Sequence, residues 1–293
     1  MEIGILAALL GVGLLTVLGS DSDDHSEDDT EETVAPDPEV GEPPVNVGTD
    51  GDDRVFIQDD NNIPNATLGD GDDRGFAFVT EGSTLSGGLG DDTLDGGTRS
   101  TLLGDEGDDR LAISDFNRSF EGQTNYDSAA FGGEGNDSLF SDRGFTEEGT
   151  VSLFGEAGND DITVDNDAGF IERGGITKVL SGGEGDDTFR VNLLFPDADP
   201  DAADPEPHTT DDTNVFITDF TPGTETLVVT AGGIGGSAAP PFETAELTRD
   251  ADGLTTLTLT FAAVGTAPPA VTTIGLGFAD GITLDDIILP GET

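Results

Sequence analysis

The first feature of the chain is an alternation of short apolar stretches with turns rich in glycine and aspartate, from residue 48 to residue 190. An apolar residue recurs two positions after an aspartate, as in Asp92-Thr93-Leu94. Because successive side chains of a strand point to opposite faces, this spacing turns one apolar side chain inward and its polar neighbours outward. The pattern predicts two short strands per repeat, one leading into each turn and one leaving it.

One nine-residue motif returns seven times, starting at residues 48, 68, 87, 104, 132, 155 and 182. GGLGDDTLD at 87–95 and GGEGDDTFR at 182–190 are two of the copies. The fourth position is always glycine, as expected where the backbone turns with positive φ: Gly51, Gly71, Gly90, Gly107, Gly135, Gly158 and Gly185. The spacing varies, which indicates one motif per coil of a solenoid with excursions of different length.

Two series of apolar residues are expected to fill the interior of this solenoid. After the turns they are Val55, Leu94, Leu111, Leu139, Ile162 and Phe189, and before the turns they are Leu85, Leu102, Ala130, Leu153 and Leu180. Gly75 interrupts the first series. The second coil is therefore expected to be the weakest.

The sixth position of the motif is aspartate in every copy: Asp53, Asp73, Asp92, Asp109, Asp137, Asp160 and Asp187. Stacked coils would place these carboxylates in a column that repels itself unless cations bind. Carboxylate and turn carbonyl oxygens suit Ca²⁺, which accepts six to eight oxygen ligands in flexible geometry, better than Mg²⁺. Zinc and copper are disfavoured, because the chain has no cysteine and only two histidines, His25 and His208.

The motif resembles the G-G-x-G-x-D-x-U-x repeat of the RTX hemolysin-type calcium-binding proteins. This resemblance implies an all-β, right-handed parallel β-roll, with several Ca²⁺ ions between neighbouring turns and a C-terminal β-rich cap. It also implies that the backbone of the turns binds Ca²⁺, at the fourth-position glycines and at Gly87, Leu89, Asp91, Gly182, Glu184 and Asp186. The copies depart from the family in not being in tandem, and Leu68 replaces the first glycine in one of them. The long interval between residues 104 and 132 could interrupt the ion ladder.

The regions around the repeats have a different character. Residues 3–18 are apolar and shorter than the roughly 20 residues that cross a bilayer as a helix, so we expect a targeting or anchor segment within residues 1–19. Residues 20–47 are acidic and contain prolines, which predicts a disordered linker. The β-roll is expected over 48–195, and an acidic proline-rich loop over 196–212.

Residues 213–293 read as a β-rich cap and secretion region. Residues 214–229 contain two apolar stretches around a Thr-Pro-Gly turn, and residues 254–261 alternate strictly. The stretch from Ile217 to Gly223 resembles the segment that follows RTX repeats and opens a domain associated with type I secretion. A solenoid whose last strand edge would otherwise be exposed needs such a cap.

Composition narrows the function. The formal net charge of −52, from 62 acidic and 10 basic residues, argues against nucleic acid and anionic membranes as partners, so membrane association is expected only through residues 3–18. No H-E-x-x-H, G-x-S-x-G or P-loop motif occurs, so no enzymatic activity is expected. We expect a secreted or cell-surface calcium-binding protein. The alternative is a surface-anchored adhesin that uses the roll to bind a polysaccharide or protein, and in the least specific interpretation the Gly-Asp turns are merely structural.

Overall fold

The structure is a computed structural model of the 293-residue chain. It describes residues 45–58, 65–78, 82–97, 99–114, 127–142, 149–167, 176–195, 214–233, 238–263 and 269–292. Two compact units are distinguished, Met1–Gly41 and Glu42–Thr293, and every described residue belongs to the second. The expected targeting segment, the acidic linker up to residue 44, the loop at 196–212 and both histidines lie outside the described residues.

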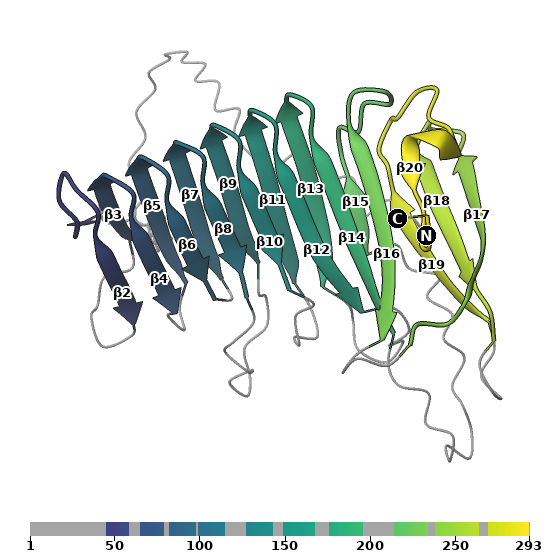
Figure 1. Ribbon diagram of the computed structural model, residues 1–293, viewed down its shortest axis with the longest axis horizontal. Coiled ribbons are helices and arrows are strands. Elements are labelled where there is room, and N and C mark those ends of the chain that lie inside the picture. Colours follow the sequence, from purple (N-terminus) through teal and green to yellow (C-terminus); the bar gives the residue numbers. More distant parts are fainter. Residues whose placement is uncertain are drawn as a thin grey trace, which may run out of the picture. The chain divides into compact units, whose positions relative to one another are not determined.

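Two long sheets make up this second unit (Figure 1). Sheet A has the strand order β1-β3-β5-β7-β9-β11-β13-β15-β19-β18-β17, and sheet B has the order β2-β4-β6-β8-β10-β12-β14-β16-β20. The strands of sheet A are β1 (Val45–Asn46), β3 (Asn65–Asp70), β5 (Ser83–Leu89), β7 (Ser100–Glu106), β9 (Ser128–Glu134), β11 (Thr150–Ala157), β13 (Thr177–Glu184), β15 (Val215–Ile217), β17 (Phe242–Arg249), β18 (Thr255–Phe261) and β19 (Ala270–Gly275). Those of sheet B are β2 (Arg54–Gln58), β4 (Arg74–Phe78), β6 (Thr93–Gly96), β8 (Arg110–Ile113), β10 (Ser138–Ser141), β12 (Asp161–Asp167), β14 (Thr188–Phe195), β16 (Thr226–Gly233) and β20 (Ile287–Ile288).

The chain passes alternately between the two sheets, and each pass through a glycine-aspartate turn leads from sheet A to sheet B. From β1 to β16 all pairings within each sheet are parallel. Equivalent motif positions are in register, as Leu94, Leu111 and Leu139 are on β6, β8 and β10. The prediction of an all-β parallel roll is confirmed. Within the described residues the only helical segment is the single 3-10 turn Leu284–Asp286.

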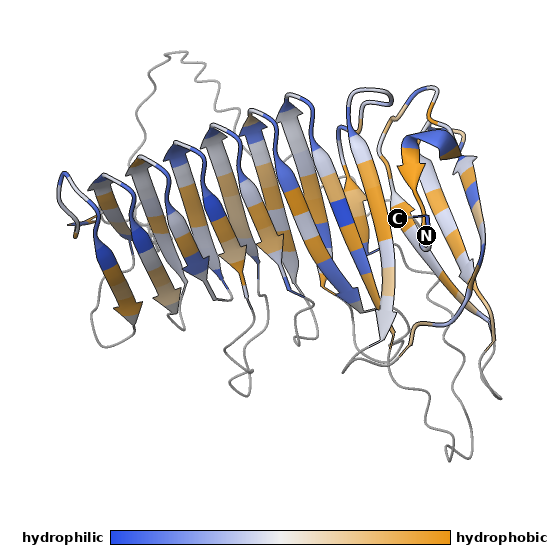
Figure 2. Ribbon diagram, in the orientation of Figure 1, coloured by the Kyte–Doolittle hydropathy of each residue, from blue (hydrophilic) through white to orange (hydrophobic). Residues whose placement is uncertain are grey.

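The core lies between the sheets and is formed by the two predicted apolar series. Almost all of them are completely buried, and only Val55 is partly exposed. Figure 2 shows the resulting alternation along the strands, with hydrophilic colour at the turns. Gly75 leaves no void, because a Cβ added there would lie 2.6 Å from Leu85 Cδ2 and 3.1 Å from side-chain carbons of Leu68 and Leu94. Neighbouring leucines thus occupy the space that a larger residue would fill.

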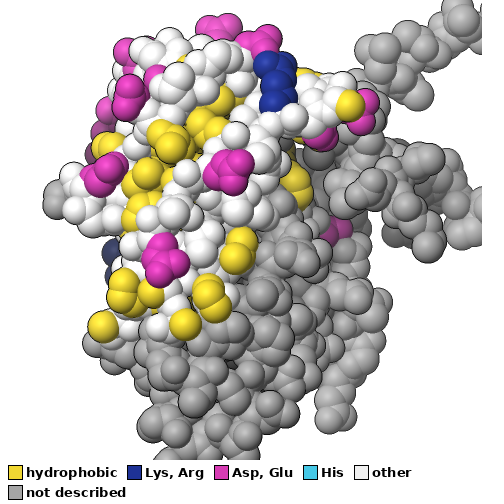
Figure 3. All heavy atoms as spheres, turned by 90° about the vertical axis from the view of Figure 1, so that its right-hand side faces the viewer, with side chains coloured by type: hydrophobic (Ala, Val, Ile, Leu, Met, Phe, Trp, Pro, Cys, Tyr) yellow, Lys and Arg dark blue, Asp and Glu magenta, His cyan; other side chains and the backbone are white. Residues whose placement is uncertain are grey.

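The roll continues beyond the seventh repeat. Strands β15 and β16 pair in parallel with β13 and β14, so the two strands around the Thr-Pro-Gly turn form one further coil. After it, β19 joins β15 in parallel, and β18 and β17 add antiparallel strands that end sheet A. One continuous core runs from Ile57 in β2 to Leu289 beyond β20, so these last strands cover the apolar end of the roll. Figure 3 shows that end, where acidic side chains surround apolar ones.

The turns repeat the same backbone conformation, in which two motif positions have positive φ. The fourth-position glycines from Gly71 to Gly185 have φ between 119° and 144°. At the second position, glycines such as Gly133 (φ 118°) alternate with Asp105 (φ 78°) and Glu156 (φ 77°). Because positive φ disfavours residues that carry a Cβ, these two non-glycine residues are strained.

Replacing Glu156 with glycine should stabilise the roll. The substitution removes the positive-φ strain, and we expect it to raise the free energy of unfolding by about 0.5–1 kcal/mol in urea denaturation. Glu184 is the matched control, because it is also an exposed glutamate before a turn but does not have positive φ. Glu184→Gly should lower the free energy of unfolding by about 0.5–1 kcal/mol. Equal effects of the two substitutions would contradict the strain at Glu156.

Candidate cation site in the stacked aspartate turns

The seven sixth-position aspartates form one continuous column along the roll. From Asp73 onward, the Oδ1 atom of each accepts a hydrogen bond from the backbone N–H of the column aspartate one coil earlier. The N···O distances are 2.7 Å from Asp53 to Asp73 and 2.9 Å from Asp160 to Asp187. The long interval after the fourth copy does not interrupt this ladder, because Asp109 N lies 2.8 Å from Asp137 Oδ1. In the sequence the extra residues follow β8 and precede β9, and β8 pairs directly with β10.

The second carboxylate oxygen, Oδ2, has no donor in six of the seven column aspartates. The six are Asp73, Asp92, Asp109, Asp137, Asp160 and Asp187. Their side chains are almost fully enclosed, with 1–2% of each residue exposed. Buried polar groups are normally hydrogen-bonded, and a buried charge without a partner is strongly unfavourable. Six such atoms in one row require the column to be neutralised, by protons or by cations.

Five of the six unpaired oxygens, all except that of Asp73, lie directly against the first-position glycine of their own turn. A Cβ added to Gly155 would lie 2.1 Å from Asp160 Oδ2 and 2.6 Å from the carbonyl oxygen of Gly182 in the next turn. The same two kinds of oxygen lie beside Gly104 and beside Gly132. A carboxylate oxygen from one turn and a carbonyl oxygen from the next therefore lie beside the same glycine, and both are oxygen donors of the kind that hard cations bind.

The backbone positions expected to bind Ca²⁺ are partly engaged in joining the turns. Third-position carbonyls accept hydrogen bonds from the fourth-position N–H one coil earlier, as Leu89 O does from Gly71 and Glu184 O does from Gly158. Each of these carbonyls retains a second lone pair. The first-position carbonyl of Gly182 faces the space beside Gly155. The sequence-predicted aspartates and turn backbone are thus gathered along one edge of the roll.

A second ladder, which the sequence reasoning did not identify, runs along the fifth motif position. Its Oδ1 atoms accept hydrogen bonds from the fifth-position N–H of the following coil, in the opposite direction to the column. The members are Asp52, Asp72, Asp91, Asp108, Asn136, Asn159 and Asp186. These side chains are exposed, and the signal in the sequence is the presence of Asp or Asn at this position in all seven copies. Asp91 and Asp186, which the sequence singled out for their backbone, therefore also take part in this ladder of hydrogen bonds between coils.

Glu225 is an eighth member of the column that the sequence reasoning also missed. Its neighbour Thr226 pairs with Thr188, and Thr226 N–H donates to Asp187 O just as the equivalent N–H of each earlier coil does. Glu225 is 6% exposed, and its Oε2 accepts the Thr221 N–H at 2.7 Å. Gly223, Glu225 and Leu227 repeat the spacing of glycine, acid and apolar residue seen in the motif.

The first member of the column is also satisfied. Asp53 Oδ2 accepts from the backbone N–H of Thr49 at 2.6 Å and from its hydroxyl at 2.8 Å. The column therefore begins and ends at carboxylates whose outer oxygens have donors, and the six unpaired oxygens lie between them.

Burial raises the pKa of the six column aspartates whose Oδ2 atoms are unpaired. Desolvation is the largest cause throughout, backbone hydrogen bonds oppose it, and neighbouring carboxylates add to it. The pKa rises to about 7 for Asp92 and Asp137, and to about 6 for Asp109 and Asp160. Desolvation also raises the pKa of Glu225 to about 7. Without cations these carboxyls keep their protons to a higher pH than ordinary aspartates do, and they lose them between about pH 6 and 7.

Other site types find little support in the described part of the chain. Its side chains include no group of three or more His, Asp or Glu residues arranged to hold a metal, so a cation would depend on carbonyls together with the column carboxylates. Among the same residues, no helix is long and apolar enough to cross a membrane. Comparisons with protein-family models and with curated proteins find no match for the chain. The resemblance to RTX repeats therefore rests on the motif.

The metal-free roll should lose stability as pH rises. Each raised pKa means that the folded state binds protons more tightly than the unfolded state does, so the stabilisation is complete below about pH 4. It is lost as pH rises to about 7, through the folded pKa values of about 6 and 7. Urea denaturation in EGTA at pH 4, 5.5 and 7.5 measures this trend. A free energy of unfolding that is flat or rises with pH would contradict it, and replacing Asp92 and Asp137 with asparagine should reduce the slope.

Proposed function

We propose that this chain is a calcium-binding protein in which Ca²⁺ between successive glycine-aspartate turns drives folding of the β-roll. The observation that carries the proposal is the row of six buried Oδ2 atoms without donors, three of them beside a carbonyl oxygen of the next turn. Several Ca²⁺ ions bound there would neutralise the carboxylates, give each Oδ2 atom a partner and offset the repulsion within the column.

The proposal includes secretion. The free energy of cation binding contributes directly to folding when the unfolded chain has no formed site. In a compartment with little calcium the column would keep the coils open, and in calcium-rich surroundings outside the cell the ions would close them. We therefore assign the protein to the extracellular space, with attachment to the cell surface through residues 3–18 as the alternative, and we assign it no catalytic role.

Asp160→Asn tests the calcium site, because the amide keeps the Oδ1 acceptor for Asp137 N–H but removes the charge of the outer atom. In EGTA at pH 7.5 the substitution should raise the free energy of unfolding, since a buried unpaired charge is lost. In calcium the order should reverse, because the variant lacks one ligand. Urea denaturation with excess Ca²⁺ and with EGTA gives both values.

Asp70→Asn is the matched control, since Asp70 is exposed on β3 and its carboxylate has no hydrogen bond in the described structure. It should respond to calcium as the unmodified chain does. Mg²⁺ at the same concentration should stabilise the unmodified chain much less than Ca²⁺. A calcium increment that is the same in the unmodified chain and in Asp160→Asn would contradict the proposed site.

A further inference from the structure

A row of arginines lies on the outward face of sheet B, near its β2 edge. The row consists of the first residues of β2, β4 and β8, which are Arg54, Arg74 and Arg110. In the register of sheet B, Arg54 pairs with Arg74, and Thr93 of β6 lies between Arg74 and Arg110. Strands within a sheet are about 4.8 Å apart, so the row places charges about 5 and 10 Å from one another along the roll. In a chain with 10 basic and 62 acidic residues, this row gathers three of the ten basic residues on one part of the surface.

These guanidinium groups have no carboxylate partner within the described part of the chain. All three arginines are exposed, and neither of the two salt bridges found there involves them. Arg190, further along the same face, differs because it is paired with Asp161 at 2.9 Å. Asp95 on β6 lies one row away from Arg74 and Arg110. The exposed aspartates at the fifth motif position precede the arginines by two residues, and none of these carboxylates forms a salt bridge with them.

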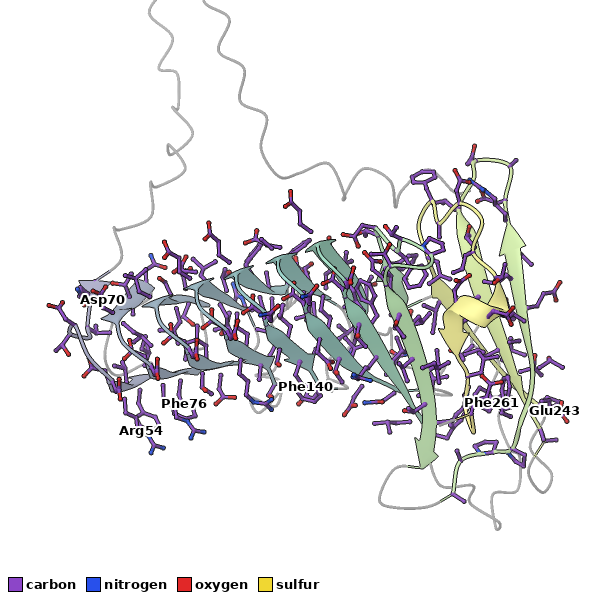
Figure 4. All side chains as sticks on the ribbon, turned by 45° about the horizontal axis from the view of Figure 1, so that its top comes forward. Arg54, Asp70, Phe76, Phe140, Glu243 and Phe261 are labelled. Atoms are coloured by element: carbon purple, nitrogen blue, oxygen red, sulfur yellow. The ribbon has the colours of Figure 1, made fainter. Side chains whose placement is uncertain are left out.

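Two aromatic rings hold the first two arginines in place. Phe56 and Phe76 are stacked with centroids 4.7 Å apart and planes 6° from parallel. Arg54 Cζ lies 5.1 Å from the centroid of Phe56, and Arg74 Cζ lies 5.0 Å from that of Phe76. Figure 4 shows Arg54 and Phe76 projecting from the outside of the roll. A guanidinium packed on a ring loses little further entropy when its N–H groups bind an anion.

We propose that this face, formed by Arg54, Phe56, Arg74, Phe76 and Arg110, binds a linear acidic polysaccharide. Arginine N–H groups match carboxylate and sulfate oxygens in pairs. The row lies across several strands, which suits a polymer whose charges repeat along its length. Phe56 is 47% exposed beside the two arginines. The inference depends on the surface of the folded roll and not on which ion folds it.

The charge of the whole molecule favours a sparsely charged polymer over other anions. Double-stranded DNA carries one charge per about 1.7 Å, and a chain with net charge −52 would repel it strongly outside the small arginine row. A second copy of this chain would meet the same repulsion. A polysaccharide with its charges spread over its sugar rings can contact the row while placing few charges near the acidic turns.

The test measures binding of the full chain by isothermal titration calorimetry, in a buffer where circular dichroism shows the β-roll. Hyaluronan supplies carboxylates alone, dextran sulfate supplies sulfate esters alone, and neutral dextran supplies neither. We expect binding to at least one acidic polymer that weakens as salt is raised, and none to neutral dextran. Binding that is equal for dextran and the acidic polymers, or absent for all of them, would overturn the proposal. Polyuridylate that binds as tightly as the acidic polysaccharides would overturn the choice of ligand class.

Variants locate the site. Arg54→Gln combined with Arg74→Gln should weaken binding about tenfold or more, because two charge-assisted contacts are lost. Arg54→Lys with Arg74→Lys keeps the charge without the planar group and should bind with intermediate affinity. Arg190→Gln is the control on the same face and should bind as the unmodified chain does. Unchanged affinity in the double glutamine variant, with its β spectrum intact, would exclude this face. The calcium response of that variant should stay normal, which separates this proposal from the calcium site.

Discussion

The stability of the β-roll depends on six buried carboxylate oxygens that have no hydrogen-bond donor. Leaving one buried polar atom unsatisfied costs about 1–3 kcal/mol, and more when it is charged. Six such atoms together match or exceed the about 5–15 kcal/mol by which a typical domain is stable. The leucine core between the sheets and the turn-to-turn hydrogen bonds act against this cost. Protons at acid pH or cations at neutral pH are the two ways in which the column itself can be neutralised.

The same column explains why the turns are built as they are. From Asp73 to Asp187, Oδ1 is used within the protein, where it accepts the N–H of the preceding turn, and only Oδ2 is left for a ligand. Where the first position is glycine, as at Gly104, Gly132 and Gly155, a Cβ would overlap Oδ2 and the carbonyl oxygen of the next turn. The fifth-position ladder faces solvent and binds in the opposite direction, so each turn is joined to both neighbours. The arginine row lies on the outward face of sheet B, and its positive charges are not paired with the column carboxylates.

The sequence predicts the repeated parts of this structure well, because they follow from local spacing. For example, Leu94 stands two residues after Asp92, and this spacing is enough to place the Leu94 side chain in the core and the Asp92 side chain in the turn. The continuation of the roll into β15 and β16 was harder to predict. The turn of this eighth coil departs from the motif, because it contains Pro222 and has Glu225 where the earlier turns have aspartate. The unpaired oxygens could not be predicted, since they depend on the rise from one coil to the next. The long interval between β8 and β9 leaves the column unbroken, because β7 pairs directly with β9 and β8 with β10.

Anomalous X-ray scattering from crystals of the chain grown with calcium would test the central claim most directly. The account predicts a row of anomalous peaks along one edge of the roll, each within bonding distance of an Oδ2 atom of the column, such as those of Asp109, Asp137 and Asp160. Crystals that show the folded turns with no anomalous peak beside these oxygens would contradict it. The column would then be neutralised by protons, and the glycine-aspartate turns would have a structural role alone.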